Sequence, residues 1–485
     1  MASGQLGYEI DGIITTIQKD EELEKKFEPL IQEVLSLGIS NGRYDARFRV
    51  LIFKLSTLLG LEEEAVTAVE TIVMENFEEQ QEEETSEQRE SRLKREKLQK
   101  RKRNILTGAA VIGGGALLAL TGGLAAPLVA AGVGAVVGGT AAAALGSVVG
   151  LAAITSLFGA TGAGLAGYKM RRRVGGVREF TFRPLSENRH LHITIAVTGW
   201  IAKEDKESFL SPWRALNHSP EQYTLQWESD HLKNLGSVLS DFVTSTVTGT
   251  VTSEVLKHSV LSSLMAAIAW PAALLKVADV IDNPWNVCAN RAKQCGHLLA
   301  DILLSRRQGH RPVTLIGFSL GARVIFYCLT EMARRPDCQG IVQDAVLLGA
   351  PVSGSADAWA PLTKVVAGRL VNAYTRSDWL LKFLYRTASV QGDIAGLMPI
   401  ELDHRVMCNV DLTGKVDGHK SYRKQLTFIL NLCGVKCRDV ETSEVNSTET
   451  LCVGDEEETI QDRHREEHKD DTDLEFCTSA PDRLK

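Results

Sequence analysis

The sequence predicts an α/β fold, a mostly parallel sheet flanked by helices, for residues 177–433. Short runs rich in β-branched and aromatic residues alternate there with helical runs, which is typical of parallel strands joined by crossover helices. The strand-like runs are apolar at successive positions, as expected when helices cover both faces of a sheet. The expected strands are residues 179–183, 192–198, 223–227, 313–317, 345–348, 370–375 and 406–411.

The rest of the chain predicts four further regions around this α/β domain. At 485 residues the chain is too long for one ordinary domain, so several units are expected. We predict a helical region, a charged helix or linker, a Gly/Ala-rich transmembrane hairpin, the α/β domain and an acidic disordered tail. In that order they cover residues 1–75, 76–103, 104–168, 177–433 and 434–485.

Two apolar stripes and one polar stretch characterise the N-terminal part. The stripes recur at the spacing of a helix face, which predicts helices packed in a bundle. Their members are Phe27, Leu30, Ile31, Val34 and Leu35, and then Phe48, Leu51, Ile52, Leu55 and Leu58. Residues 78–92 contain no apolar residue, so they lack the seam that a coiled coil needs and predict a solvated helix or linker.

The sequence of residues 104–168 contains no charged residue and consists mainly of small and aliphatic residues. Its length is more than twice the roughly 20 residues that cross a bilayer, and small residues at four-residue spacing favour close helix packing. Basic residues end at Arg103 and resume at Lys169, so both flanks should face the cytosol. These features predict a two-pass hairpin broken near Pro127. The alternative is a buried Gly/Ala helical pair in a soluble core.

The composition excludes several classes of partner and site. A formal net charge of -7 and a pI near 6.0 give no basis for nucleic-acid binding. The nine cysteines follow no zinc-binding spacing, and their odd number predicts reduced thiols facing the cytosol. The first residues lack a basic segment followed by an apolar run, so we expect no cleaved signal peptide. We predict no cofactor and no metal ion.

Residues 317–321 read Gly-Phe-Ser-Leu-Gly and match the G-x-S-x-G nucleophile elbow. This motif needs a sharp strand-to-helix turn that holds the serine in a strained backbone conformation. Here it directly follows the expected strand at 313–317 and directly precedes a helical run. The context therefore predicts an α/β-hydrolase domain with Ser319 as its nucleophile.

An elbow serine needs a histidine and a carboxylate, in the chain order Ser, Asp or Glu, His for this fold. Asp378 follows the strand at 370–375 and His419 follows the strand at 406–411, at the sheet edge expected for Ser319. We predict His419 as general base and acid and Asp378 as the group that fixes the imidazole tautomer. Asp357, which follows the strand at 345–348 at the same edge, is the alternative acid.

Other candidate residues fit the site less well. Asp344 begins a strand and so belongs to the opposite edge of the sheet. His310 precedes the nucleophile strand, His404 opens the last strand, and His297 lies on a helical stretch. We expect these histidines to be structural or surface residues.

The oxyanion hole should use backbone N–H groups at the same edge. Leu320 follows the nucleophile and supplies one N–H, and Trp200, after the strand at 192–198, supplies the second. Gly199 would let this backbone approach the substrate carbonyl, although a glycine after a strand is also a common turn.

The long insertion before the nucleophile strand contains one strongly apolar segment, residues 261–281, interrupted by Pro271. One interpretation is a core helix packed on the sheet. The other is a lid or acyl-chain pocket over the serine, since sites for apolar substrates exclude water. The sequence supports both equally.

Several sequence blocks together resemble one known family. They are the basic-flanked Gly/Ala-rich region, WESDHLKNLGS at 227–237, GFSLGARVI at 317–325, LLGAPV at 347–352 and NAYTRSDWLL at 372–381. Over residues 1–435 the chain resembles the transmembrane and coiled-coil domain-containing protein 4 family. The resemblance implies an α/β-hydrolase fold on an integral membrane protein, with Ser319, Asp378 and His419 in the triad positions. It implies no particular substrate.

These observations lead to one expected function and two alternatives. We expect a membrane-anchored, multi-pass serine esterase or lipase with a cytosolic hydrolase domain, acting on lipid-like acyl esters through an acyl-enzyme. Its expected partners are the lipid bilayer and a lipid or acyl-ester substrate, with a cytosolic protein as a further candidate. The alternatives are a non-catalytic membrane adaptor that retains the fold, and a membrane-remodelling or channel-like protein built on the hairpin.

Overall fold

The computed structural model describes residues 12–19, 27–82, 157–158, 165, 176–186, 189–201, 209–216, 221–248, 272–385, 393–416, 419 and 421–438. The chain divides into two units, Met1–Cys437 and Arg438–Lys485, and the structure described below belongs to the first. Most of the expected hairpin and of the expected acidic tail lies outside the described residues.

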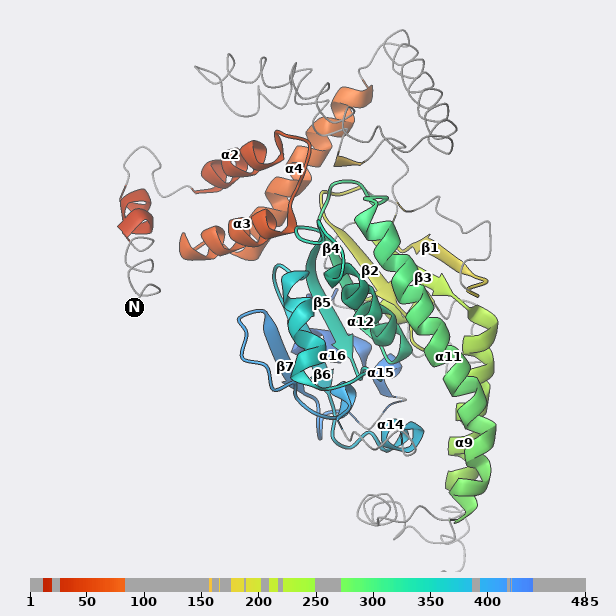
Figure 1. Ribbon diagram of the computed structural model, residues 1–485. Coiled ribbons are helices and arrows are strands. Elements are labelled where there is room, and N and C mark those ends of the chain that lie inside the picture. Colours follow the sequence, from red (N-terminus) through yellow and green to blue (C-terminus); the bar gives the residue numbers. More distant parts are fainter. Residues whose placement is uncertain are drawn as a thin grey trace, which may run out of the picture. The chain divides into compact units, whose positions relative to one another are not determined.

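A seven-stranded sheet forms the centre of the first unit, in the order β1-β3-β2-β4-β5-β6-β7 (Figure 1). β1 pairs antiparallel with β3, and the other neighbours pair in parallel. The strands are β1 (Phe180–Pro184), β2 (Ile193–Val197), β3 (Glu221–Trp227), β4 (Val313–Phe318), β5 (Val342–Leu348), β6 (Leu370–Tyr374) and β7 (Met407–Asp411). All seven expected strands are therefore present, and the predicted α/β class is confirmed.

Helices cover both faces of this sheet. In chain order, the helices of the described part include α2 (Glu28–Ile39), α3 (Ala46–Leu58), α4 (Glu63–Glu82), α9 (Ser229–Thr248), α11 (Ala272–Leu304), α12 (Leu320–Ala333), α13 (Ala356–Trp359), α14 (Trp379–Leu384), α15 (Ser421–Lys424) and α16 (Leu426–Leu432). Short 3₁₀ turns lie at Ser211–Trp213, Ala360–Lys364 and Ala395–Leu397.

Successive side chains of one strand lie in two separate cores, one on each face of the sheet. In β4, Leu315 joins the core that includes α11 and α12, whereas Ile316 and Phe318 join the core that includes α16. Successive residues of a strand point to opposite faces, so both faces must be apolar to be buried. In Figure 1, α11 and α12 lie in front of the sheet and α16 lies behind it.

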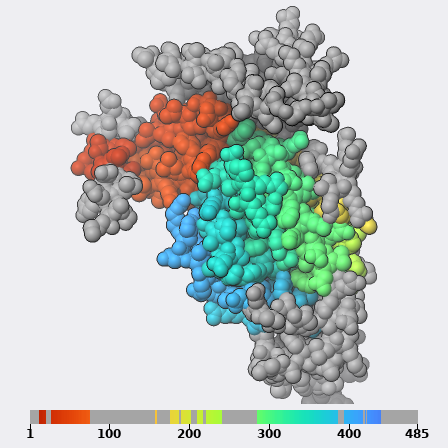
Figure 2. All heavy atoms as spheres, viewed as in Figure 1, coloured from red at the N-terminus to blue at the C-terminus, as the bar shows by residue number. Residues whose placement is uncertain are grey.

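The N-terminal helices α2, α3 and α4 form a third core, which includes all of the first predicted stripe. Of the second stripe, Phe48, Ile52 and Leu55 pack in this core, whereas Leu51 and Leu58 are exposed, so the prediction was wrong for these two residues. Asp45 caps α3, since its side chain accepts the backbone N–H of Arg47 at 2.8 Å. In Figure 2 the orange surface of these helices meets the surface of the sheet region. Arg49 of α3 makes part of that contact through a 2.7 Å hydrogen bond to Gln343 of β5.

A buried ion pair lies at this junction. The guanidinium of Arg49 is 2.7 Å from the carboxylate of Glu70, and the side chains are 3% and 0% exposed. The hydroxyl of Tyr44 also donates to Glu70 at 2.6 Å. Burial alone would raise the pKa of Glu70, but the charge and hydrogen bonds of Arg49 outweigh burial and hold that pKa below its usual range.

Three residues from the end of the expected membrane hairpin are buried in protein. Leu157 and Phe158 belong to the N-terminal core, and Leu165 belongs to the core on the α11 face. The backbone N–H of His310 donates to the carbonyl of Leu157 at 2.8 Å, and the guanidinium of Arg311 lies 4.3 Å from the centre of the Phe158 ring. No helix in the described ranges is both long enough and apolar enough to cross a bilayer.

The insertion before β4 forms the helix pair α9 and α11, which run side by side in Figure 1. Only part of the apolar segment at 261–281 is described, and that part begins α11. Pro284 lies inside the same helix. The two interpretations of this segment, core helix or lid, therefore depend on residues outside those described.

Helix α4 extends to Glu82, so the start of the polar stretch at 78–92 is helical.

Candidate active site

Ser319 lies on a strained turn between β4 and α12, with φ 54° and ψ -126°. A non-glycine residue at positive φ costs about 1–3 kcal/mol and persists only where its surroundings fix it. Here the backbone N–H of Ser319 donates to Leu348 of β5 at 2.9 Å, and its carbonyl accepts the N–H of Arg323 at 3.1 Å. The turn that the G-x-S-x-G motif predicts is present.

Both glycines of the motif lie so close to neighbouring backbone atoms that no side chain would fit there. A Cβ atom on Gly321 would lie 2.0 Å from the carbonyl oxygen of Val197 in β2. A Cβ atom on Gly317 would lie 2.8 Å from the carbonyl carbon of Gly321. Real Cβ atoms do not approach that closely, so these positions let α12 start directly against the sheet.

The structure brings Ser319, His419 and Asp378 together in one hydrogen-bonded chain. The Ser319 Oγ atom is 2.6 Å from His419 Nε2, and His419 Nδ1 is 2.6 Å from Asp378 Oδ2. An ionised carboxylate only accepts hydrogen bonds, so Nδ1 carries the proton and Nε2 is left to accept from the serine hydroxyl. The three residues are 2%, 4% and 0% exposed.

The local fold places both partners of Ser319. Asp378 follows β6 and is the N-cap of α14, where its Oδ1 atom accepts the N–H of Leu381 at 2.9 Å. His419 follows β7, the next strand in the sheet. Because β4, β6 and β7 run in parallel in one sheet, the segments after them meet at the same edge.

The alternative acids lie elsewhere. Asp357 is exposed in the first turn of α13 and, among the described residues, makes no hydrogen bond to His419. Asp344 lies near the start of β5, at the opposite edge of the sheet, and accepts the backbone N–H of Arg369 at 2.6 Å.

The other histidines do not face Ser319 in the described structure. His404 is exposed, and His310 lies before β4, at the far end of that strand from Ser319. His297 lies on α11, with its ring centre 6.4 Å from that of Tyr327.

The loop after β2 packs directly against the elbow, as expected for an oxyanion hole. A Cβ atom on Gly199 would lie 2.7 Å from the backbone nitrogen of Leu320 and 2.1 Å from the carbonyl oxygen of Phe318. Leu320 is the first residue of α12, where N–H groups have no acceptor within the helix. Trp200 follows Gly199, and no described residue accepts a hydrogen bond from the backbone N–H of either Leu320 or Trp200.

Sequence reasoning missed Arg323, which anchors the loop after β5. Its guanidinium donates to the carbonyl of Ala289 at 3.0 Å and to that of Pro351 at 2.6 Å. The hydroxyl of Tyr385 donates to the same Pro351 oxygen at 2.6 Å. A signal was available, because Arg323 is a lone charge four residues after Ser319 on an otherwise apolar stretch of α12.

Tyr422 is a second residue that the sequence did not single out. Its ring centre is 5.7 Å from that of His419, and a Cβ atom on Gly349 would lie 3.0 Å from its hydroxyl. Burial, reinforced by the charge of Asp378, raises the pKa of Tyr422 well above its ordinary value. The tyrosine therefore stays neutral and limits the space available to the imidazole.

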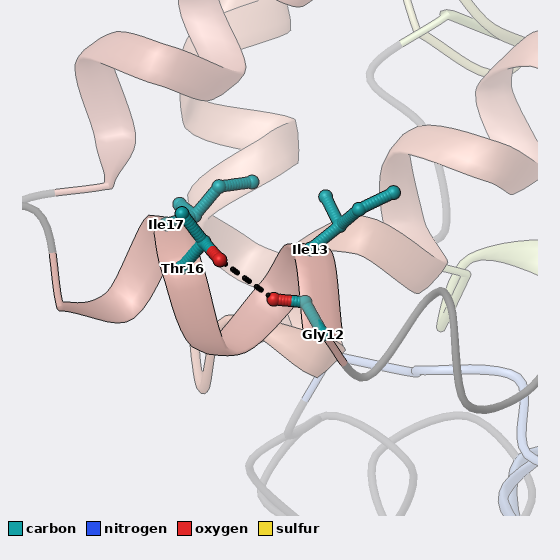
Figure 3. Close-up of a pocket in the computed structure, with 4 residues that line it drawn as sticks. All are labelled: Gly12, Ile13, Thr16 and Ile17. Atoms are coloured by element: carbon teal, nitrogen blue, oxygen red, sulfur yellow. Dashed lines mark hydrogen bonds between the residues drawn. The ribbon is translucent and has the colours of Figure 1, made fainter.

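No group of three or more potential metal-binding side chains occurs in the described part of the chain. A hollow of about 500 Å³ lies on the helix at residues 12–18. Figure 3 shows its lining residues, Gly12, Ile13, Thr16 and Ile17. None of these side chains is titratable, and the Thr16 hydroxyl already donates to the carbonyl of Gly12 at 2.8 Å. None of the predicted site residues lines this hollow.

Comparison with known proteins gives the family. Residues 99–436 match the family described as protein of unknown function DUF726. The chain belongs to this family. DUF726 spans the segment from the basic stretch before the Gly/Ala-rich region to the end of the last described helix, and so includes the whole Ser319 site. No solved structure matches the chain.

Three curated relatives put the DUF726 chain in context. An uncharacterized membrane protein of Caenorhabditis elegans is 44% identical over 84% of this chain, and the rice transmembrane and coiled-coil domain-containing protein STS1 (Oryza sativa subsp. japonica) is 43% identical over 80%. The probable lipase MIL1 of Saccharomyces cerevisiae is 32% identical over 86%. The matched parts span 66%, 60% and 39% of these relatives' own lengths. The predicted family resemblance is confirmed.

Proposed function

We propose that this DUF726 protein is a membrane-bound serine hydrolase of the α/β-hydrolase class that cleaves lipid-like acyl esters. The observation that carries the proposal is the continuous chain from Ser319 Oγ through His419 to Asp378 at a strained elbow. A buried serine at positive φ costs stability, and activating a nucleophile gives a physical reason for that cost.

In the proposed reaction, Ser319 Oγ attacks the ester carbonyl while His419 Nε2 takes the hydroxyl proton. The N–H groups of Leu320 and Trp200 donate to the oxyanion of the tetrahedral intermediate. His419 then gives its proton to the departing alcohol, which leaves an acyl group on Ser319. Water activated by His419 hydrolyses this acyl-enzyme, and Asp378 stays ionised throughout to stabilise the imidazolium.

The membrane location and the lipid-like substrate are supported by the names of the relatives and by the sequence, and not by the geometry around Ser319. The relatives' names include membrane proteins and one probable lipase. The uncharged sequence before Leu157, residues 104–156, offers a bilayer anchor, and two crossings would leave the hydrolase domain in the cytosol. All seven described cysteines are unpaired, in accord with a reducing compartment. A cytosolic protein partner remains a prediction from the sequence.

The first test is labelling of the detergent-solubilised full chain with a fluorophosphonate probe, with Ser319→Ala as the control. We expect labelling of the native chain and none of the variant, because only an activated serine reacts. Hydrolysis of p-nitrophenyl butyrate and palmitate would then report the preferred acyl length. A well-folded native chain that neither labels nor hydrolyses either ester would refute the proposal and favour a non-catalytic adaptor.

A further inference from the structure

Thr198, the residue after β2, is held by two buried tryptophans. The indole N–H of Trp213 donates to Thr198 Oγ1 at 2.9 Å, and that of Trp227 donates to the Thr198 carbonyl at 3.1 Å. Trp213 and Trp227 are 1% and 0% exposed and belong to different cores, on opposite faces of the sheet. The side-chain hydroxyl of Thr198 is therefore held from one face of the sheet, and its backbone carbonyl is held from the other face.

Fixing the Thr198 carbonyl also restrains the N–H of Gly199, because both belong to one planar trans peptide group. Trp227 therefore restrains the plane of the Thr198–Gly199 peptide. The next peptide group carries the Trp200 N–H, and its position depends in addition on the packing of Gly199. The β-branched Thr198 side chain has few rotamers, so the bond from Trp213 restrains the backbone as well as the hydroxyl.

The other end of the same loop is fixed by close packing. A Cβ atom on Gly236 of α9 would lie 1.9 Å from the carbonyl oxygen of Ile201. Gly199, in between, rests on the backbone of Phe318 and Leu320 at the elbow. The segment 198–201 is thus held at its start by the two tryptophans, at its middle by the elbow and at its end by α9.

We propose that Trp213 and Trp227 are positioning residues that hold Thr198, and through it the backbone N–H of Trp200, in place to receive the oxyanion. This inference rests on the proposed function. Oxyanion stabilisation depends on donors that are already oriented when charge develops. A displacement of about 1 Å can cost about a hundredfold in rate, so two buried hydrogen bonds at the start of the loop have a catalytic effect without touching substrate.

The test compares kcat and KM for p-nitrophenyl butyrate in the full chain carrying Thr198→Val, Trp213→Phe, Trp227→Phe or the double variant Thr198→Val/Trp213→Phe. We expect each single variant to lose about tenfold to a hundredfold in kcat with KM changed less than about threefold. Thr198→Ser, which keeps the acceptor, should recover most of the kcat that Thr198→Val loses.

The double variant separates positioning from stability. Thr198→Val leaves the Trp213 N–H buried without a partner and should lower Tm. Trp213→Phe lowers Tm through the cavity that the smaller ring leaves, but it removes the unpaired N–H. We therefore expect the double variant to lose less Tm than the sum of the two single losses, while its kcat stays as low as that of the single variants. Trp359→Phe is the matched control: Trp359 is fully buried and its indole donates to the Ser353 carbonyl at 2.8 Å, and this variant should keep its kcat.

The outcomes are distinct. An inactive but folded native chain overturns the proposed function and this inference with it. An active native chain whose Thr198, Trp213 and Trp227 variants keep their kcat overturns the inference alone. A kcat that follows Tm across the single and double variants also overturns it, because the effect would then be one of stability.

Discussion

Asp378 accepts the backbone N–H of Leu381 with one carboxylate oxygen and faces His419 Nδ1 with the other. The same side chain therefore begins α14 and orients the imidazole. Its conformation is fixed by its hydrogen bond at the start of the helix. This double role distinguishes Asp378 from Asp357, which lies exposed in the first turn of α13.

Replacing Asp378 should separate these two roles. In Asp378→Asn the amide can donate to Nδ1, which favours the wrong tautomer, and kcat should fall by about 10⁴-fold. Asp378→Ala should lose a similar factor in kcat and about 1 kcal/mol more in stability, because the cap is lost as well. Ester hydrolysis and urea unfolding measure the two effects. Activity lost in Asp357→Asn but kept in Asp378→Asn would assign the acid to Asp357.

Gly321→Ala should destabilise the chain by about 3 kcal/mol or more. The new Cβ would lie 2.0 Å from the Val197 carbonyl oxygen, so α12 must move away from β2 or the strand must shift. Gly12→Ala is the control, because nothing lies within 4 Å of its Cβ position on the helix at 12–18. This change should be neutral or stabilise by up to about 1 kcal/mol. Equal unfolding midpoints for the two variants would contradict the close packing of the elbow.

Arg323 and Tyr385 should be energetically coupled through the Pro351 carbonyl. Arg323→Met removes three hydrogen bonds from a charged donor, to the carbonyls of Ala289 and Pro351 and to the Tyr385 hydroxyl. Tyr385→Phe removes the bond that the hydroxyl donates to Pro351 and the one that it accepts from Arg323. We expect losses of about 2–4 and about 1 kcal/mol in the free energy of unfolding. A double-mutant cycle should give a coupling of about 0.5 kcal/mol or more, since both donors share one acceptor. Strict additivity would mean that the two contacts act independently.

Much of the fold and the site follows from local sequence signals. β4 is an apolar run followed at once by the elbow, and chain order is consistent with His419 and with either Asp357 or Asp378. Choosing between Asp378 and Asp357 requires the direction in which each carboxylate points. For Asp378 that direction depends on where α14 begins, because this residue caps the helix. The contacts of Trp213 and Trp227 with Thr198 could not be predicted, because they form only in the folded chain. Trp227 lies in β3, which pairs with β2, and Trp213 lies in the 3₁₀ turn before β3.

The end of the uncharged stretch shows a further limit of sequence reasoning. Leu157 and Phe158 lie in a run whose composition suits a bilayer, yet they pack in the N-terminal core. An apolar composition indicates that a segment is shielded from water, but it does not indicate whether lipid or protein shields it. The deciding contacts come from residues far away in the chain, His310 and Arg311.

The Arg49–Glu70 pair should make the stability of the chain depend on pH in the acid range. The pKa of Glu70 is lowered in the folded state, so its ionised form contributes stability above its unfolded pKa of about 4.3. That contribution is lost as pH falls through the lower folded pKa. Urea unfolding at a series of pH values from about 7 to about 3 should show this loss in the native chain.

Glu70→Gln should remove that part of the pH dependence and cost about 3–5 kcal/mol at neutral pH, because it leaves the Arg49 charge buried without its partner. The double variant Arg49→Met/Glu70→Leu is the matched comparison. It removes both charges, so it should recover much of the stability at neutral pH and keep the flatter acid profile. A Glu70→Gln variant that loses stability on acidification as steeply as the native chain would show that other carboxylates cause the effect.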